Sequence, residues 1–400
     1  MAYKAICGYS DMSEAIKITI GGDLFPTSIN YQLFSEGKAE AIFGEEVCNI
    51  FKSSDYSICN LEGCFTDENT PPKLKDGPKI RAPKECVAAI VDLGVDCVSL
   101  ANNHATDYGT DGLRDTCAVL ETAKISYFGA GLNDTTVSTH KTISLKGKKI
   151  TFYGVSETIE NVPAKDIPGV NIYDEYRVCN ELKRLKDDCD YLIVFYHGGI
   201  ENIHYNTPSI RTRFHRMAEN GADIIISQHT HAIGEEEYYH GAYLLYGQGN
   251  FCFHFSKSLH EWVMTGLLLE VELNDNGFGV KKHIVRRDGA RIVYDNEQDF
   301  SDFYERSKRL SEDDDFNSEL AKLSDEKIAI YLQAFRGKNV FDRIVKKVLP
   351  EDKYIAYLKK HYTKKQILKI LLALQCEEFR EVSSQGLRNM LEQLEVQHGK

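Results

Sequence analysis

Residues 222–231 read ADIIISQHTH, an apolar run that ends in two histidines. A continuous run of small and β-branched apolar residues is typical of a strand that is buried on both faces of a sheet. In open α/β sheets, ligands bind at the carboxyl ends of the strands. The segment therefore predicts a buried strand that delivers His229 and His231 to a binding site at its end.

Six other segments of the chain are also short apolar runs of this kind. The further candidate strands are IKITIGGD (16–23), YSICNLE (56–62), CVSLANN (97–103), KKITFYGV (148–155), YLIVFYHGG (191–199) and AYLLYGQGNFCF (242–253). Helices are expected between them near residues 31–53, 84–94, 111–123, 174–188 and 208–220, the last with Pro208 in its first turn. This alternation predicts an α/β fold from residue 16 to about residue 295.

Polar side chains with useful chemistry stand where these strands end. They are carboxylates, an amide and imidazoles: Asp23, Glu62, Asn103, His104, His197, His229 and His231. Divalent transition metals in proteins take nitrogen and oxygen donors of these kinds. One such motif alone is a weak signal, since GGD is usually a turn and an isolated HxH pair is often a polar core pair. Their joint occurrence at successive strand ends favours one convergent metal site.

Local spacing adds two expectations about this site. Side chains at i and i+2 on a regular strand share one face, so the rings of His229 and His231 can address one pocket. Asp107 follows the Asn103–His104 pair, an arrangement in which a carboxylate can orient a catalytic imidazole ring.

Composition narrows the classes of function and location. The formal net charge of −12 gives no global electrostatic support for nucleic-acid binding. The eleven cysteines are scattered without a CxxC pair, which favours reduced thiols over a disulfide framework. The N-terminal residues lack the charged and apolar regions of a signal peptide, and no stretch approaches the ~20 apolar residues of a membrane span. These features together predict a cytoplasmic protein.

The character of the sequence changes beyond residue 300. Strands give way to charged segments rich in Leu and Lys. Three of these segments read as amphipathic helices: EKIAIYLQAF (326–335), NVFDRIVKKVL (339–349) and KKQILKILLALQCEEF (364–379). We therefore expect one domain at 1–300 and a helical C-terminal region at 301–400, which can form a homo-oligomer or bind a protein partner.

Several of these motifs resemble, in order and rough spacing, the bacterial capsule-synthesis protein family CapA. The similar segments are ITIGGDLF (18–25), NLEGCFTD (60–67), RAPKECV (81–87), VSLANNHATDYGTDGL (98–113), YHGGIENIHYNTPS (196–209) and SQHTHAIGEEEYYHGAYLLYGQGNF (227–251). The resemblance covers residues 16–256 and leaves the C-terminal region unexplained. That family is associated with poly-γ-glutamate and other capsule biosynthesis and belongs to the calcineurin-like metallophosphatase superfamily. It implies a four-layer α/β/β/α sandwich.

The resemblance also implies roles for individual residues around one or two divalent ions of Mn, Fe or Zn. The first ion would be bound by Asp23, Glu62 and His231. The second ion would be bound by Glu62, Asn103, His197 and His229, so that Glu62 bridges the two ions. His104 corresponds to the acid that contacts the phosphate. Phe25 stands where the superfamily usually has a further histidine, so we expect one firm ion site and one weaker or substrate-completed site.

The function that the resemblance implies is a metal-dependent, phosphoesterase-like hydrolase in capsule or extracellular polymer biosynthesis, with His104 and Asp107 as its catalytic pair. Its substrate would be an anionic small molecule or polymer, with Arg81, Glu201 and His254 as candidate contacts. Without a role in substrate binding, Arg81 would lie in a solvated loop, Glu201 on the surface, and His254 in the core or on the surface. Two other functions stay open: a non-catalytic, metal-stabilised scaffold of a polymer synthesis or export complex, and a metal-dependent amidase on γ-glutamyl links.

Overall fold

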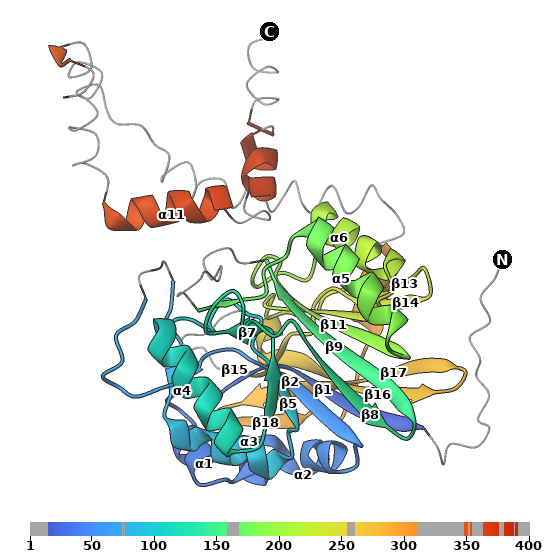
Figure 1. Ribbon diagram of the computed structural model, residues 1–400. Coiled ribbons are helices and arrows are strands. Elements are labelled where there is room, and N and C mark those ends of the chain that lie inside the picture. The colour runs from blue at the N-terminus through green and yellow to red at the C-terminus, as the bar shows by residue number, and fades with distance from the viewer. Residues whose placement is uncertain are drawn as a thin grey trace.

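Two β-sheets lie face to face in the computed structural model, and helices cover both outer faces (Figure 1). The structure describes residues 15–73, 75, 77–157, 168–253, 261–309, 348–350, 353, 363–375, 380–387 and 389–390. The layers follow the order helices, sheet, sheet, helices. This arrangement confirms the α/β fold predicted from the sequence and the four-layer α/β/β/α sandwich that the family resemblance implies.

The first sheet has parallel strands at its centre and an antiparallel edge. Its order is β18 (Arg291–Tyr294), β17 (Gly277–Asp288), β16 (Thr265–Asn274), β1 (Ile16–Phe25), β2 (Tyr56–Leu61), β5 (Cys97–Ser99) and β6 (Ser126–Phe128), and β15 (Asn250–Phe253) also pairs with β1. Because β1, β2, β5, β6 and β15 run parallel, their carboxyl ends meet at one edge. The sequence predictions missed β6, which has three residues, and β16–β18, where charged residues interrupt the apolar runs.

The second sheet has a parallel centre and an antiparallel strand at each edge. Its order is β13 (Glu236–Tyr239), β14 (Ala242–Leu245), β12 (Ile224–Gln228), β11 (Tyr191–His197), β9 (Lys148–Ser156) and β8 (His140–Leu145). β9, β11 and β12 are predicted from continuous apolar runs, whereas the partly exposed edge strands were not predicted. The single strand predicted over 242–253 needs correction, because this run divides into β14 in this sheet and β15 in the first. Two short sheets pair β3 (Cys64–Phe65) with β4 (Arg81–Ala82) and β7 (Ala130–Gly131) with β10 (Gly169–Val170).

The helices lie where the sequence predicts them. Those packed on the first sheet are α1 (Tyr31–Ser35), α2 (Ala39–Lys52), the 3-10 turn η1 (Lys84–Cys86), α3 (Val87–Leu93) and α4 (Gly109–Thr122), and those on the second are α5 (Glu175–Asp187) and α6 (Pro208–Glu219). The helix prediction near 31–53 needs correction, because the segment divides into α1 and α2, and Gly44, with a φ of 76°, interrupts α2 with a kink. Gly37, with a φ of 65°, adopts the left-handed conformation that ends α1.

Apolar side chains from both sheets form the core between them. Its buried members include Ile18, Ile20, Ile193, Phe195 and Ile226. A second apolar layer lies between the first sheet and its helices. There the fully buried Phe251 of β15 stacks on Phe43 and Phe51 of α2, with ring centroids 5.2 and 5.5 Å apart. These two layers fix the sheets against each other and against α2.

The part of the C-terminal region that directly follows the sheets packs onto them. In α7 (Ser301–Arg309), the side chain of Phe303 belongs to the core between the sheets. Arg306 Nη2 donates to the carbonyl oxygen of Ile233 at 3.2 Å. Further on, α11 (Lys364–Gln375) matches a predicted helix, whereas the predicted helix at 326–335 and most of that at 339–349 lie outside the described residues. None of the described helices is long and apolar enough to cross a membrane.

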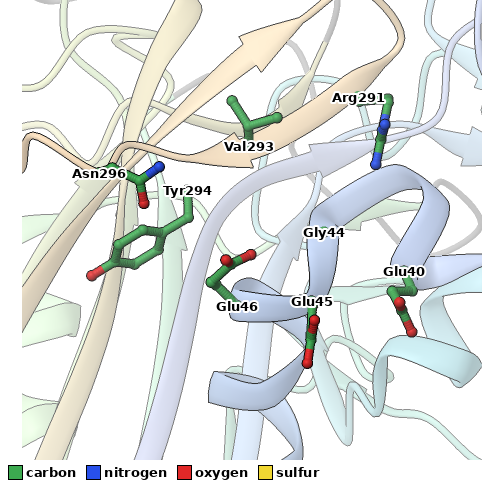
Figure 2. A pocket seen from close by; sticks show the side chains of 8 residues that line it. All are labelled: Glu40, Gly44, Glu45, Glu46, Arg291, Val293, Tyr294 and Asn296. Carbon is green, nitrogen blue, oxygen red and sulfur yellow. The ribbon is translucent and has the colours of Figure 1, made fainter.

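A hollow of about 350 Å³ lies between α2 and β18 (Figure 2). Its lining includes Glu40, Glu45 and Glu46 of α2 and Arg291 and Tyr294 of β18. None of the candidate site residues predicted from the sequence lines this hollow. The hollow is therefore separate from the site at the strand ends.

Replacing Phe251 with Ala should lower the free energy of unfolding by about 3–5 kcal/mol, because it leaves a cavity between β15 and α2. The measurement is urea unfolding of both proteins followed by circular dichroism. Val91→Ala on the exposed face of α3 is the control and should change stability by less than ~0.5 kcal/mol. Equal losses for the two variants would contradict this account of the core.

Candidate metal centre

The predicted site residues meet where strands of the two sheets end. Asp23 is in β1, Glu62 directly follows β2, and His197 is the last residue of β11. His229 and His231 come from the loop after β12. All five are buried, with side chains between 0 and 9% exposed. The two sheets thus bring one convergent cluster together at their carboxyl edges.

The cluster contains two sets of atoms that can hold a metal ion. Glu62, His197 and His229 form one set, and Asp23, Glu62 and His231 form the other, with the ligand atoms of each set within 4.8 Å of one another. Asn103 Oδ1 lies 2.8 Å from His197 Nε2 and adds an amide oxygen to the first set. Because Glu62 belongs to both, its carboxylate lies between the two candidate ion positions.

Glu62 is the clearest sign that the cluster fits a cation. Neither of its carboxylate oxygens has a hydrogen-bond partner among the described residues, although both are buried. Oε1 lies 3.6 Å from His197 Nε2 and 3.9 Å from His104 Nε2. Burial, reinforced by the charges of Asp23 and Glu201, raises the pKa of Glu62 well above its ordinary value. A buried carboxylate without a partner is costly, and a divalent ion is a partner of the right charge.

The imidazoles around Glu62 are suited to bind a metal in their neutral form. Burial lowers the pKa of His197 well below its ordinary value and that of His229 to about 4. Both rings are therefore neutral near pH 7, which is the form that binds metals. Burial also lowers the pKa of His231, but the hydrogen bond and charge of Asp23 outweigh it and raise that pKa overall. A cation bound beside Asp23 would replace the proton on His231.

The two histidines of the HxH motif face the cluster for a reason other than the one predicted. The strand β12 ends at Gln228, so neither ring is placed by strand geometry. His229 and His231 instead have φ angles of 87° and 54°, in the left-handed region of backbone conformation that residues other than glycine rarely adopt. The ring of His229 faces His197, with centroids 4.8 Å apart, whereas His231 Nδ1 lies 3.4 Å from Asp23 Oδ2. Strained backbone of this kind clusters at functional sites.

Asp107 lies where it can orient the ring of His104. Asp107 Oδ2 is 2.6 Å from His104 Nδ1, which leaves His104 Nε2 directed toward Glu62. Burial raises the pKa of Asp107, but His104 and Lys75 outweigh it, so that the pKa is lowered overall. The Lys75 ammonium donates to Asp107 and, at 3.1 Å, to the carbonyl oxygen of Asn103. The sequence predictions missed Lys75, because nothing in its loop distinguishes a buried lysine from an exposed one.

Amide side chains that were also missed hold the ligands in place. Asn60 Nδ2 donates to Asp23 Oδ1 at 2.8 Å, and Asn102 Nδ2 donates to Asn60 Oδ1 at 3.1 Å. Asn250 Oδ1 lies 3.0 Å from His231 Nδ1. Asn60 and Asn102 lie within two residues of a predicted ligand, and Asn250 lies in the GNF motif. Their positions in the sequence could therefore have identified them as neighbours of the cluster.

The three predicted substrate contacts have different placements. Arg81 donates to the carbonyl oxygens of Asp67 and Glu68, and no described contact joins its guanidinium to the cluster. Glu201 lies at the rim, with its Oε1 3.9 Å from His229 Nε2 and about half of its side chain exposed. His254 lies outside the described residues. Of the two described candidates, the structure thus brings only Glu201 to the cluster.

Phe25 occupies the position where the resemblance leads one to expect a further histidine. Its side chain is fully buried and packs against the ring of Phe65, with centroids 5.3 Å apart. It belongs to the apolar core on the helical side of the first sheet. The Asp23–His231 set therefore has fewer donors than the Glu62–His197–His229 set, to which Asn103 adds an oxygen.

The sequence comparison assigns this α/β sandwich and its strand-end cluster to a family. Residues 17–255, more than half of the chain, match the family described as bacterial capsule synthesis protein PGA_cap. The chain belongs to this family. The matched residues include every candidate ligand in the cluster and end before α7.

Curated relatives agree with this assignment. The chain is 26% identical over 278 residues to the capsule biosynthesis protein CapA of Bacillus anthracis, which covers 67% of this chain and 66% of that protein. It is 28% identical over 280 residues to the PGA biosynthesis protein CapA of Bacillus subtilis (strain 168), covering 68% and 70%. The similarity thus spans about two-thirds of the length of these relatives.

Solved structures with some similarity include proteins described as phosphatases and nucleotidases. A novel phosphatase from Mycoplasma pneumoniae is 17% identical, with a TM-score of 0.42, and covers 72% of this chain and 99% of that one. A 5′-nucleotidase precursor from Thermus thermophilus is 10% identical, with a TM-score of 0.42, and covers 70% and 54%.

Replacing Glu62 with Gln should stabilise the metal-free protein at pH 7 by about 1–3 kcal/mol, because it removes a buried, unpartnered charge. A raised pKa means that the folded state holds the proton more tightly than the unfolded state. The loss of stability that the Glu62 carboxylate causes in the wild-type protein is therefore greatest at high pH and disappears as the pH falls toward 4.5. Urea unfolding in the presence of a chelator, from pH 8 to pH 5, measures this difference.

The exposed Glu46→Gln on α2 is the matched control for this experiment and should change stability little at any pH. A Glu62→Gln protein that is less stable than the wild type at pH 8 would show that the carboxylate has a stabilising partner.

Proposed function

We propose that this chain is a metal-dependent hydrolase, phosphoesterase-like in mechanism, that acts in the biosynthesis of a bacterial capsule or extracellular polymer such as poly-γ-glutamate or a polysaccharide. The observation that carries the proposal is the buried Glu62 carboxylate, without a hydrogen-bond partner among the described residues, shared by two sets of imidazole and carboxylate groups. The polymer class comes from the family and from the names of its curated relatives.

Two ions, or one, would be held by the two ligand sets that share Glu62. When bound, such ions lower the pKa of a coordinated water and polarise the electrophile. The mixture of nitrogen and oxygen donors suits Mn, Fe or Zn. The set around His197 and His229 has the additional oxygen of Asn103, so we assign it the firmer ion and the Asp23–His231 set the weaker one.

His104 is the residue that we assign to the leaving group. Its Nε2 faces Glu62, and its Nδ1 is held by Asp107, so the ring presents one defined nitrogen to the cluster. A ring held in this way can protonate or stabilise a leaving oxygen without having to reorient. Asp107 and Lys75 act through His104 and the Asn103 backbone, which makes them positioning residues.

A metal-dependent amidase is the second candidate function. The name of the Bacillus subtilis relative refers to PGA biosynthesis, and γ-glutamyl links are amides. The same ligands and activated water can attack an amide carbon, so that geometry alone does not separate the two reactions. A screen with both a phosphodiester and a γ-glutamyl amide distinguishes them.

The proposal extends to location and partners. Several thiols in the sheets, such as those of Cys59 and Cys97, are fully buried, which fits a protein of the reducing cytoplasm. On α11, Ile367 and Leu371 are 45% and 40% exposed, which suits contact with a protein partner or a second copy.

Purified without added metal, the wild-type protein should contain a near-stoichiometric transition metal, and His229→Ala should lose at least half of it, because one ligand set loses an imidazole. Mass spectrometry of the metal content measures this. With added manganese, the wild type should hydrolyse a generic phosphodiester, and His229→Ala should do so at least ~100-fold more slowly.

His215→Ala on α6 is the matched control, since His215 pairs with Glu237 rather than with the cluster, and it should retain both metal and activity. A wild-type protein that holds no metal and takes up neither manganese nor zinc would refute the metallohydrolase. A protein that binds metal but hydrolyses neither substrate would instead support the non-catalytic scaffold.

A further inference from the structure

The loop between β11 and α6 carries a carboxylate to the mouth of the metal centre. It leaves β11 after His197 and turns at Gly199, whose φ is 107°. The backbone N–H of Asn202 donates to the carbonyl oxygen of Thr230 at 2.7 Å. This bond ties the loop to the segment that carries His229 and His231. Glu201 lies between these two anchoring points, beside His229 and outside the two sets of ligand atoms that lie within 4.8 Å of one another.

The distance between Glu201 and His229 fits two donors on one ion. Glu201 Oε1 lies 3.9 Å from His229 Nε2, close to the 3.6 Å between Glu62 Oε1 and His197 Nε2. Metal–nitrogen and metal–oxygen bonds of roughly 2.0–2.2 Å place two donors of one ion about 3–4 Å apart. No hydrogen bond joins the Glu201 side chain to another described side chain, so its carboxylate is not committed elsewhere.

The surroundings of Glu201 differ from those of the other acidic groups in the cluster. Asp23 and Glu62 are completely buried, whereas 49% of the Glu201 side chain is exposed, so it covers the outer side of the centre.

We propose that Glu201 is a further metal ligand, which the loop supplies to the ion held by Glu62, His197 and His229. This inference rests on the proposed metal centre but is independent of the reaction that it catalyses. With Asn103, Glu201 gives this half of the centre five donors. Glu201 thus makes the two ion positions unequal.

The test uses the full chain, stripped of metal with a chelator and titrated with Co²⁺ as the probe. Calorimetry gives the dissociation constant of each ion, and the visible absorption of Co²⁺ reports its coordination number. Glu201→Gln and Glu201→Ala should raise the dissociation constant of the tighter ion about tenfold or more and strengthen its visible absorption. The weaker ion and the unfolding midpoint of the metal-free protein should not change, because Glu201 is half exposed.

Glu46→Gln, an acidic residue of α2 outside the cluster, is the matched control and should behave as the wild type. Unchanged dissociation constants and spectra in both Glu201 variants would overturn the assignment, even if hydrolysis falls. A wild-type protein that binds no Co²⁺ would refute the metal centre itself. The two failures are therefore distinguishable.

Discussion

The buried carboxylate of Glu62 is the constraint on which the rest of this structure depends. It lies at the end of a central strand, without a hydrogen-bond partner among the described residues and close to Asp23. Two apolar cores, one between the sheets and one beneath the helices, hold the strands firmly enough to keep it there. Because the fold keeps this carboxylate buried without a partner, a cation bound beside it would stabilise the folded protein.

The residues around Glu62 show how the chain limits that cost. Asn60 and Asn102 link Asp23 to the neighbouring strands through hydrogen bonds, and Asn250 holds the ring of His231. On the other side, Asp107 and Lys75 form a buried ion pair that holds the His104 ring. Polar groups in the interior are stabilising only when their partners are in place. The network therefore orients the candidate ligands before any ion is bound.

The segment that follows the family domain is connected to the same centre. The match to the capsule synthesis family ends at residue 255, yet α7 contacts the segment after β12 that carries His229 and His231. Arg306 donates to the Ile233 carbonyl oxygen, and Ser307 Oγ accepts the backbone N–H of Glu236. This loop has left-handed backbone at both histidines of the cluster, and α7 holds its far end.

The sequence by itself determined most of the inner parallel strands, the covering helices and the polar residues at the strand ends, because long apolar runs leave a buried strand as the favourable outcome. Asp23, Glu62 and His197 could be named in advance, since a polar residue that ends such a run must face the carboxyl edge. Only the tertiary structure decided the edge strands, the burial of Lys75 and the contacts of Arg81. Those outcomes depend on which segments meet across the two sheets, and local pattern carries no information about such long-range contacts. The same holds for the HxH loop, because its left-handed backbone is maintained by packing against Asp23 and Asn250, which belong to strands of the other sheet.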